Sequence, residues 1–295
     1  MANKLLLIDG MALLFRSYFA TAIHGRFMEN SKGIPTNGVN GLIKHTLTAI
    51  DTFRPDYVVC CWDMGSKTFR TEMFESYKAN RNEPPEQLIP QFDLAKQVIE
   101  ELRIENVGVK NYEADDCIGT IAEKYKEEME IIVLTGDRDL LQLVDSSIHV
   151  AILQKGIGNY EIFTVDSFVE KYEIQPKQLI DVKALMGDTS DNYPGVKGIG
   201  EKTAFKLIRE YENVDQLLEH LDHLTPSQKK KISACLEDLH LSRKLAAIHT
   251  SVPMKTPTFT HTFSLSQDQL NKAIQKYDIR GIQTKGIQFL QEVSS

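Results

Sequence analysis

The 295-residue chain lacks the features of a membrane, secreted or disulfide-bonded protein. No apolar run approaches the roughly 18 residues that a membrane span needs, and the run Leu5-Leu-Leu-Ile8 is too short for a secretion signal. The four cysteines have no Cys-x-x-Cys spacing, so we expect free thiols rather than a disulfide framework or a metal-thiolate site. We therefore predict a cytoplasmic protein that makes no contact with a membrane.

The chain also lacks the surplus of positive charge that is typical of nucleic-acid-binding proteins, since its net charge is −7. The charge is unevenly divided, however. Residues 1–180 carry 19 basic and 27 acidic side chains, whereas residues 181–295 carry 15 and 14. If some of the acids in the first part hold divalent cations, local basic stripes can still govern a surface that binds DNA.

Three apolar runs each end at or near an aspartate. The runs are Lys4–Asp9, Tyr57–Asp63 and Glu130–Asp137, and helical patterns lie between them. This alternation predicts an α/β fold with a mainly parallel central sheet flanked by helices, and a site at the carboxyl ends of its strands. Any one of these acids alone could equally cap the helix that follows it. Three together favour a shared site.

The pattern changes after the third of these runs. Residues 151–153 and 160–163 read as two short strands of a hairpin at the edge of the sheet, and a mostly helical remainder begins at Thr164. We predict an α/β domain over residues 1–173 and a mostly helical, DNA-binding subdomain over residues 174–295. From Ser251 onward the sequence carries no clear signal, and residues 286–295 read as a loose tail.

Further carboxylates accompany those at the strand ends. Tyr112-Glu-Ala-Asp-Asp116 places three acids within four residues at the start of a helical pattern, which is more than the helix dipole requires. Mutual repulsion would shift their pKa values unless a cation lies among them. Asp188 and Asp191 have i, i+3 spacing, so on one helical turn both would face the same side. The candidate metal ligands are Asp9, Asp63, Glu113, Asp115, Asp116, Asp137, Asp139, Asp188 and Asp191.

No histidine or cysteine near these acids completes a zinc-like set. Ligation by oxygen alone favours Mg²⁺ or Mn²⁺ over Zn²⁺. A pair of such ions about 4 Å apart is the arrangement that enzymes use to hydrolyse phosphodiesters. The acids therefore predict two-metal phosphodiester chemistry.

A glycine-rich stretch, Pro194-Gly-Val-Lys-Gly-Ile-Gly200, follows Asp191 directly. Its order, Gly-x-x-Gly-x-Gly, is the reverse of the dinucleotide-binding fingerprint and follows no apolar strand. A helix-hairpin-helix over residues 188–211, which grips DNA phosphates through backbone amides, fits it better. Lys202, Lys206 and Arg209 then recur on one helix face as a phosphate-tracking surface. The candidate DNA-binding residues here are Gly195, Lys197, Gly198, Gly200, Lys202, Lys206 and Arg209.

The segment 65–103 is rich in charge and lies between two of the acid positions. Lys67, Arg70, Lys78 and Arg81 are spaced to share one helical stripe, and Tyr77 is one of three aromatic residues among them. A solvated amphipathic helix is the simpler interpretation. Beside a carboxylate cluster, however, such cations and rings can hold phosphates and stack on unpaired bases.

These motifs together resemble the bacterial 5'-nuclease (flap endonuclease) family, which includes the nuclease domains joined to type A DNA polymerases. The resemblance covers about residues 4–260. The matching motifs are Ile8-Asp-Gly10, Trp62-Asp63, Tyr77-Lys-Ala-Asn-Arg81, Tyr112-Glu-Ala-Asp-Asp116, Thr135-Gly-Asp-Arg-Asp139, and the stretch from Gly187 to Gly200. No polymerase region follows, so the chain looks like the stand-alone form.

The resemblance implies a role for each group of residues. It implies a PIN-like nuclease core with a helical arch, and it divides the acids into two metal clusters. Asp9, Asp63, Glu113 and Asp115 would serve the first, and Asp116, Asp137, Asp139, Asp188 and Asp191 the second. Lys78 and Arg81 match a basic pair in the arch, Arg16 matches an arginine after the first strand, and these three would act on phosphates as catalytic residues. Lys202 matches a lysine of a hairpin motif that often holds K⁺ in the family.

We therefore expect a monomeric, Mg²⁺-dependent 5' nuclease that acts on DNA with 5' flaps, nicked ends or RNA-primed ends. Two other hypotheses remain open: a branched-DNA-binding scaffold without activity, and a single-strand ribonuclease. The ribonuclease hypothesis does not explain the hairpin after Asp191. Gln283 has no apolar residue three positions later, so we expect no clamp-binding peptide.

Overall fold

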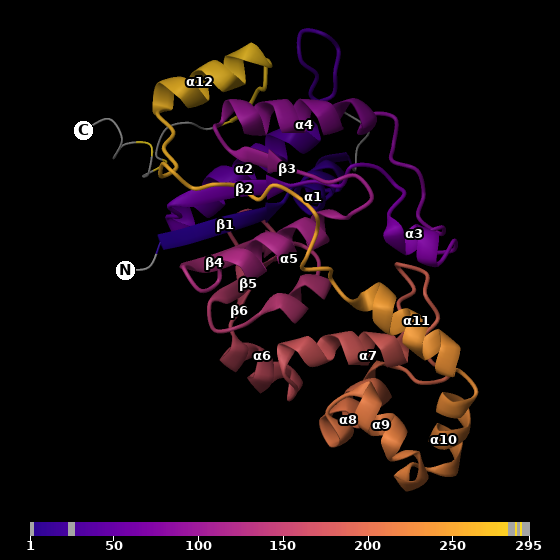
Figure 1. Ribbon diagram of the computed structural model, residues 1–295. Coiled ribbons are helices and arrows are strands. Elements are labelled where there is room, and N and C mark those ends of the chain that lie inside the picture. Colours follow the sequence, from indigo (N-terminus) through magenta and orange to yellow (C-terminus); the bar gives the residue numbers. More distant parts are fainter. Residues whose placement is uncertain (1–2, 23–26, 283–286, 288–289, 291–295) are drawn as a thin grey trace.

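A six-stranded sheet forms the centre of the molecule. The computed structural model describes residues 3–22, 27–282, 287 and 290 (Figure 1). The strand order is β3-β2-β1-β4-β5-β6, and only the pairing of β5 with β6 is antiparallel. The strands are β1 (Asn3–Asp9), β2 (Tyr57–Cys61), β3 (Glu105–Val107), β4 (Met129–Thr135), β5 (Ile148–Leu153) and β6 (Tyr160–Phe163). The mainly parallel α/β fold is thus confirmed, and β3 is a strand that the sequence did not predict.

Alternate residues of the strands feed two separate cores, because successive side chains of a strand point to opposite faces of the sheet. Leu6 and Ile8 of β1 face one core, whereas Leu5 and Leu7 face the other. The first core is closed by α1 (Gly10–Thr21), α2 (Asn37–Phe53), α4 (Ile89–Glu101) and α12 (Gln267–Lys276). The second is closed by α5 (Ala114–Tyr125), the 3₁₀ helix η2 (Asp139–Leu143) and α6 (Val165–Tyr172). With both faces buried, the strands read as continuous apolar runs.

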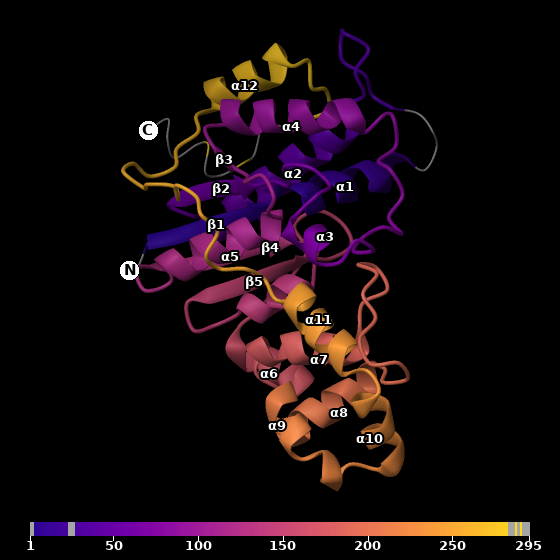
Figure 2. The same cartoon turned by 45° about the vertical axis from the view of Figure 1, so that its right-hand side comes forward.

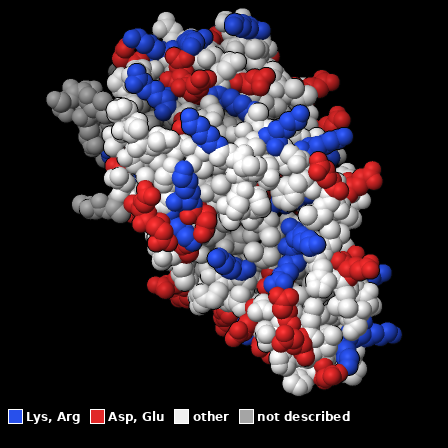
Figure 3. All heavy atoms as spheres, viewed as in Figure 1, with Lys and Arg blue, Asp and Glu red and all other residues white. Residues whose placement is uncertain are grey.

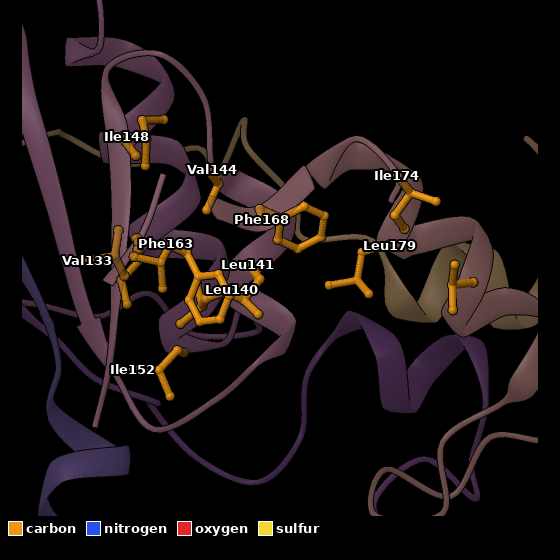
Figure 4. Packing of buried hydrophobic residues seen from close by; sticks show 14 of the residues in the cluster. Val133, Leu140, Leu141, Val144, Ile148, Ile152, Phe163, Phe168, Ile174 and Leu179 are labelled. Carbon is orange, nitrogen blue, oxygen red and sulfur yellow. The ribbon is translucent and has the colours of Figure 1, made fainter. Parts of the chain in front are cut away.

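A helical unit extends from the second core at the lower right of Figure 1. It contains η3 (Pro176–Gln178), α7 (Leu179–Met186), α8 (Glu201–Tyr211), α9 (Val214–Glu219), η4 (Leu221–His223), α10 (Pro226–Ser233) and α11 (Leu236–Ala246). Its apolar side chains continue the core beneath the sheet, and Figure 4 shows Phe163 and Phe168 between the strand residues and Leu179. The helical unit is therefore packed firmly on the sheet layer and is not a loosely tethered module.

The single helical stripe predicted across residues 67–81 is wrong. Within this segment the structure has only α3 (Phe69–Met73), followed by turns. Lys78 adopts the left-handed conformation, with φ at 57°. Arg70 is buried while Lys67 is exposed, so the four cations do not share a face. The helical arch was expected over about residues 65–103. In that range the structure has the short α3 and then α4, whose apolar side chains pack in the core.

The end of the chain also departs from the predicted division. After α11 the chain runs back along the sheet to α12, as Figures 1 and 2 both show. Leu265 and Leu270 are buried in the core on the α4 side, and the N–H of Phe263 donates to the carbonyl of Asp56. Residues from about 263 onward therefore belong with the sheet layer and not with the helical unit. Gln283 and most of the predicted tail lie outside the described residues.

Within the described residues, no helix is both long and apolar enough to cross a membrane. Figure 3 shows basic and acidic side chains interspersed over the face seen in Figure 1, not one continuous basic stripe. Any DNA-binding face must therefore be identified from local geometry.

Candidate active site

Five of the predicted acids line one pocket at the carboxyl edge of the sheet. Asp9 ends β1, Asp63 and Asp137 each follow a strand by two residues, and Glu113 and Asp115 lie at the start of α5. Because parallel strands end at the same edge, the fold brings them together. The pocket has a volume of about 220 Å³. Its charged lining residues are Asp9, Asp63, Lys78, Arg81, Glu113, Asp115 and Asp137.

Asp9 is the most tightly held of these acids. The N–H of Ala12 donates to its Oδ1 (2.9 Å), and the hydroxyl of Thr135 donates to its Oδ2 (2.8 Å). Burial raises the pKa of Asp9 to about 7, reinforced by the charges of Asp63 and Asp137 and opposed by these two hydrogen bonds. Its orientation is therefore fixed while its charge lacks a cationic partner among the described residues.

Asp115 and Asp139 are subject to the same repulsion. Burial, together with the charges of Asp9, Asp137 and Glu113, raises the pKa of Asp115 well above its ordinary value. Burial and Asp137 raise the pKa of Asp139 to about 6, although Lys183 opposes the shift. Carboxylates that raise each other's pKa values favour the arrival of positive charge.

Asp139 and Asp188 form a second group around a lysine of α7. The ammonium of Lys183 lies 2.6 Å from Asp139 Oδ1 and 2.5 Å from Asp188 Oδ2. Burial alone would raise the pKa of Asp188, but hydrogen bonds from Lys183 and Ser190 outweigh it and lower the pKa to about 2. This carboxylate is therefore ionised across the physiological range.

Asp191 has different partners from Asp188, and they include the two basic residues that line the acid pocket. Arg81 donates to its Oδ1 (2.6 Å), Tyr77 donates to its Oδ2 (3.0 Å), and Lys78 donates to Glu113 (2.8 Å). The helical turn expected over Asp188 and Asp191 is wrong, because residues 187–192 form a turn closed by the pairing of Asp188 with Tyr193. Tyr77 is also misplaced as a DNA-stacking residue, because it is only 4% exposed.

Asp116 does not reach the pocket, which corrects its place among the metal ligands. Its side chain is fully buried, and both of its oxygens accept from the guanidinium of Arg70 at 2.7 and 2.8 Å. The N–H groups of Glu113 and His249 also donate to it. Arg70 further donates to the carbonyls of Leu245 and Ala247. The pair therefore joins α5 to the end of α11 and has a structural role.

Arg16 lies on α1 but not in the acid pocket. It donates to the carbonyl of Gln154 and lines a separate cavity between α1, α2 and the loop after β5. The predicted action of Arg16 on the reacting phosphate is therefore not supported by its position.

The helix-hairpin-helix consists of α7, the loop 187–200 and α8. Gly195 is buried, its N–H donates to Ser242, and an added Cβ would lie 2.2 Å from the nitrogen of Gly187. This glycine is therefore needed for close packing, and its amide is not available to DNA. Lys197, Gly198 and Gly200 are exposed at the tip of the loop.

The basic face of α8 is smaller than predicted. Lys202 and Lys206 are exposed and, among the described residues, have no carboxylate partner. Arg209 instead pairs with Glu173 at 2.9 Å and donates to the carbonyl of Tyr172, so it holds α8 against the end of α6. Two lysines, not three cations, remain for phosphates.

Lys183 and Thr135 are two site residues that the sequence reasoning missed. Lys183 precedes Asp188 by five residues in the sequence. A lysine in a helical pattern close to a candidate acid could have predicted the ion pair between them. Thr135 is the first residue of the motif Thr135-Gly-Asp-Arg-Asp139, in which the two acids are the stronger signal for a metal site. Both orient carboxylates that the sequence did identify.

The type of ligand atom in the acid pocket suits a hard divalent cation. All of its ligand atoms are oxygens, and burial, together with the charges of Asp63 and Asp137, raises the pKa of Asp9. In the part of the chain that the structure describes, no three acidic, histidine or cysteine side chains converge closely enough to enclose an ion. The acids line a pocket with room between them, and Lys78, Arg81 and Lys183 neutralise some of them.

Two family models match the chain. One, described as the 5'-3' exonuclease N-terminal resolvase-like domain, matches residues 4–173, and the other, the 5'-3' exonuclease C-terminal SAM fold, matches residues 174–269. A 5'-3' exonuclease of Bacillus subtilis (strain 168) is 59% identical over 281 residues, which are 95% of each chain. DNA polymerase I of Lactococcus lactis subsp. cremoris is 40% identical over 257 residues, which are 86% of this chain and 29% of the polymerase.

Solved structures of low identity share the fold. The T5 D15 protein co-crystallized with metal ions has a TM-score of 0.70 at 18% identity, covering 99% of this chain and 100% of that one. The catalytic core of Rad2 in complex with DNA substrate reaches 0.62 at 13% identity, covering 99% and 92%. Flap endonuclease-1 from Methanococcus jannaschii reaches 0.56 at 19% identity, covering 99% and 91%.

Proposed function

Because the chain belongs to the 5'-3' exonuclease family, we propose that it is a structure-specific 5' nuclease that hydrolyses DNA at 5' flaps and at nicked or RNA-primed ends. The observation that carries the proposal is the pocket at the carboxyl edge of the sheet, where five carboxylates meet Lys78 and Arg81. Acids alone would repel a phosphodiester. Acids that hold cations, with two basic side chains at the rim, attract and polarise it.

Some residues of the site would bind metal ions, and others fix the orientation of the carboxylates that do so. Asp9, Asp63, Glu113, Asp115 and Asp137 would hold Mg²⁺, with Mn²⁺ able to replace it, and Asp139, Asp188 and Asp191 would serve a second ion. Two such ions supply a nucleophile from water near neutral pH and stabilise the charge that develops on the leaving oxygen. Thr135 and the amide of Ala12 keep the carboxylate of Asp9 turned into the pocket.

Three basic side chains of this site now neutralise acids. Lys78 and Arg81 pair with Glu113 and Asp191, and Lys183 pairs with Asp139 and Asp188. With cations bound to the carboxylates, Lys78 and Arg81 would be available to donate to the oxygens of the reacting phosphate. Lys183 remains between the two acids of the second group and limits their mutual repulsion.

The duplex would lie along the helix-hairpin-helix. The exposed loop at Lys197, Gly198 and Gly200 and the lysines Lys202 and Lys206 form a surface that contacts phosphates without reading sequence. We also propose that carbonyl oxygens of this loop hold K⁺ when DNA is bound. The protein would act as a monomer on DNA in the bacterial cytoplasm, where such a substrate is found.

A comparison of three substrates tests the proposal. Equal concentrations of a 5'-flap duplex, a 3'-flap duplex and a single-stranded RNA of the flap's length are incubated with Mg²⁺, and products and binding are measured together. We expect product from the 5' flap alone. Tight binding of the flap without product in Mg²⁺ or Mn²⁺ would favour the scaffold hypothesis, and preferential loss of the RNA would favour the ribonuclease.

Lys78→Ala and Arg81→Ala are expected to slow flap cleavage roughly 10²-fold each, with less than about a threefold change in affinity for the duplex. Both side chains line the acid pocket, and neither is one of the loop and α8 residues proposed to contact the duplex, so we expect them to act mainly in the transition state. Single-turnover rates and filter binding in EDTA separate the two effects. Equal losses in rate and affinity would contradict a role at the reacting phosphate.

Lys202→Gln combined with Lys206→Gln is expected to give the opposite pattern. Loss of two phosphate contacts reduces the slope of log Kd against log salt by about 2 and weakens binding, while the rate at saturating enzyme changes little. The matched control is Arg209→Gln, because this side chain is occupied by Glu173 and Tyr172 and should leave the slope unchanged. The same slope for the wild type, the double variant and Arg209→Gln would show that α8 does not contact DNA phosphates.

A further inference from the structure

A second cavity lies on the other side of α1 from the acid pocket. Met11, Ala12 and Phe15 of this helix line the acid pocket, whereas Arg16, Ser17 and Ala20 line the second cavity. It has a volume of about 560 Å³, within the range of small-ligand sites. Leu153 and Gln154, at the carboxyl end of β5, also line it. Both cavities therefore open along the same edge of the sheet.

The charge of the second cavity is opposite to that of the first. Arg16, Lys44 and Lys155 line it, and no acid is among the described residues that do so. Within the described part of the chain none of the three cations pairs with a carboxylate, and Arg16 donates only to the carbonyl of Gln154. Three cations without carboxylate partners around one cavity attract an anion, whereas a neutral ligand gains no such electrostatic attraction.

Two buried polar side chains in the wall of the cavity lack partners. Ser17 is 3% exposed and His45 is 5% exposed, and neither Ser17 Oγ nor His45 Nδ1 has a hydrogen-bond partner among the residues that the structure describes. Buried polar groups without a partner are rare in folded proteins because the group loses its hydrogen bonds to water and gains none in return. Burial and Arg16 lower the pKa of His45 to about 4, so its ring is neutral and offers one donor and one acceptor. Both residues line the cavity, so its wall is polar beside the three cations.

The mouth of the cavity is apolar on one side. Met28 is 43% exposed and Ile157 is 48% exposed, and both line the hollow. A ligand that matches cations at one end and exposed aliphatic side chains at the other must itself be amphipathic. Inorganic phosphate or sulfate meets only the first requirement.

We propose that this second cavity binds a nucleotide, with its phosphate among Arg16, Lys44 and Lys155 and its base against Met28 and Ile157. The nucleotide is either a free mononucleotide or one residue of a DNA strand that lies along the sheet edge. Both sources present the same phosphate and base. The site is separate from the hydrolytic pocket and does not depend on the proposed nuclease activity.

The probe is the 5'-monophosphate of 2-aminopurine deoxyribonucleoside, whose fluorescence anisotropy rises when it binds a protein of this size. The titration contains EDTA, so that the uncompensated acids of the first pocket repel the probe. Lys44→Gln/Lys155→Gln is expected to raise the Kd about tenfold, which corresponds to about 1.4 kcal/mol. Ala20→Trp retains every charge but fills the mouth from an exposed helix position, and it should raise the Kd similarly.

Lys272→Gln, at an exposed lysine of α12, is the control and should leave the Kd unchanged. Failure of the wild type to bind the probe, or equal binding by all four proteins, would overturn the proposal. Binding of 5'-flap DNA in EDTA then identifies the source. If Ala20→Trp weakens the binding of DNA as well as of the probe, the nucleotide belongs to a DNA strand. If this variant weakens the binding of the probe alone, the ligand is a free mononucleotide.

Discussion

Replacing Asp115 with asparagine is expected to lower the single-turnover rate of flap cleavage by roughly 10³-fold. The substitution keeps the size and shape of the side chain and removes one negative charge from the centre of the acid pocket. Asp9, Asp137 and Glu113 all act electrostatically on this carboxylate, so it contributes to the field that holds a divalent ion. Rates are measured at saturating protein over a range of Mg²⁺ concentrations.

The same substitution should not weaken DNA binding in EDTA, because it removes repulsion between the pocket and a phosphate. The control is Asp93→Asn, an exposed acid of α4 at a distance from the pocket lining, which should cleave like the wild type. A rate for Asp115→Asn within threefold of the wild type would exclude this side chain from metal binding. A loss of DNA affinity equal to the loss of rate would show that the variant is misfolded.

Replacing Arg70 with methionine is expected to lower the free energy of unfolding by about 3–5 kcal/mol. Methionine retains much of the volume of the side chain but leaves Asp116 as a buried, unpaired carboxylate. It also removes the donors to the carbonyls of Leu245 and Ala247, which tie the end of α11 to the sheet layer. Urea unfolding followed by circular dichroism measures the loss.

Lys272→Met serves as the control for this prediction, because its exposed side chain forms only an i, i+4 pair, worth about 0.5 kcal/mol or less. The double variant Arg70→Met/Asp116→Asn should be less destabilised than the sum of its single variants, since the buried charge is then absent. If Arg70→Met cost less than about 1 kcal/mol, the pair would not be a structural link.

The sequence predicted best where one pattern repeats. Apolar runs that end in aspartate identified β1, β2 and β4, and their parallel order placed Asp9, Asp63 and Asp137 at one edge. Short elements carried less signal. The strand β3 has three residues, and α12 was missed although its capping box, Ser266 with Gln269, is visible in the sequence.

Long-range contacts caused the errors within the site. Asp115 and Asp116 are adjacent on α5 and so point about 100° apart, which means that only one of them can face the pocket. The sequence does not say which one, because the partner of Asp116 is 46 residues away. The expected helix over residues 67–81 failed for the same reason. Buried contacts of Arg70 and Tyr77 outweigh helix propensities of less than about 0.7 kcal/mol per residue.

The most direct test of the account is a denaturing gel of a duplex with a labelled 5' flap, incubated with wild type or Asp188→Ala in Mg²⁺ or EDTA. Asp188 is ionised and paired with Lys183, and it is not one of the hairpin residues proposed to contact phosphates, so its loss should affect the chemistry and spare DNA binding. We expect product near the flap junction only for the wild type in Mg²⁺. Product in EDTA, or full Mg²⁺-dependent turnover by Asp188→Ala, would contradict it.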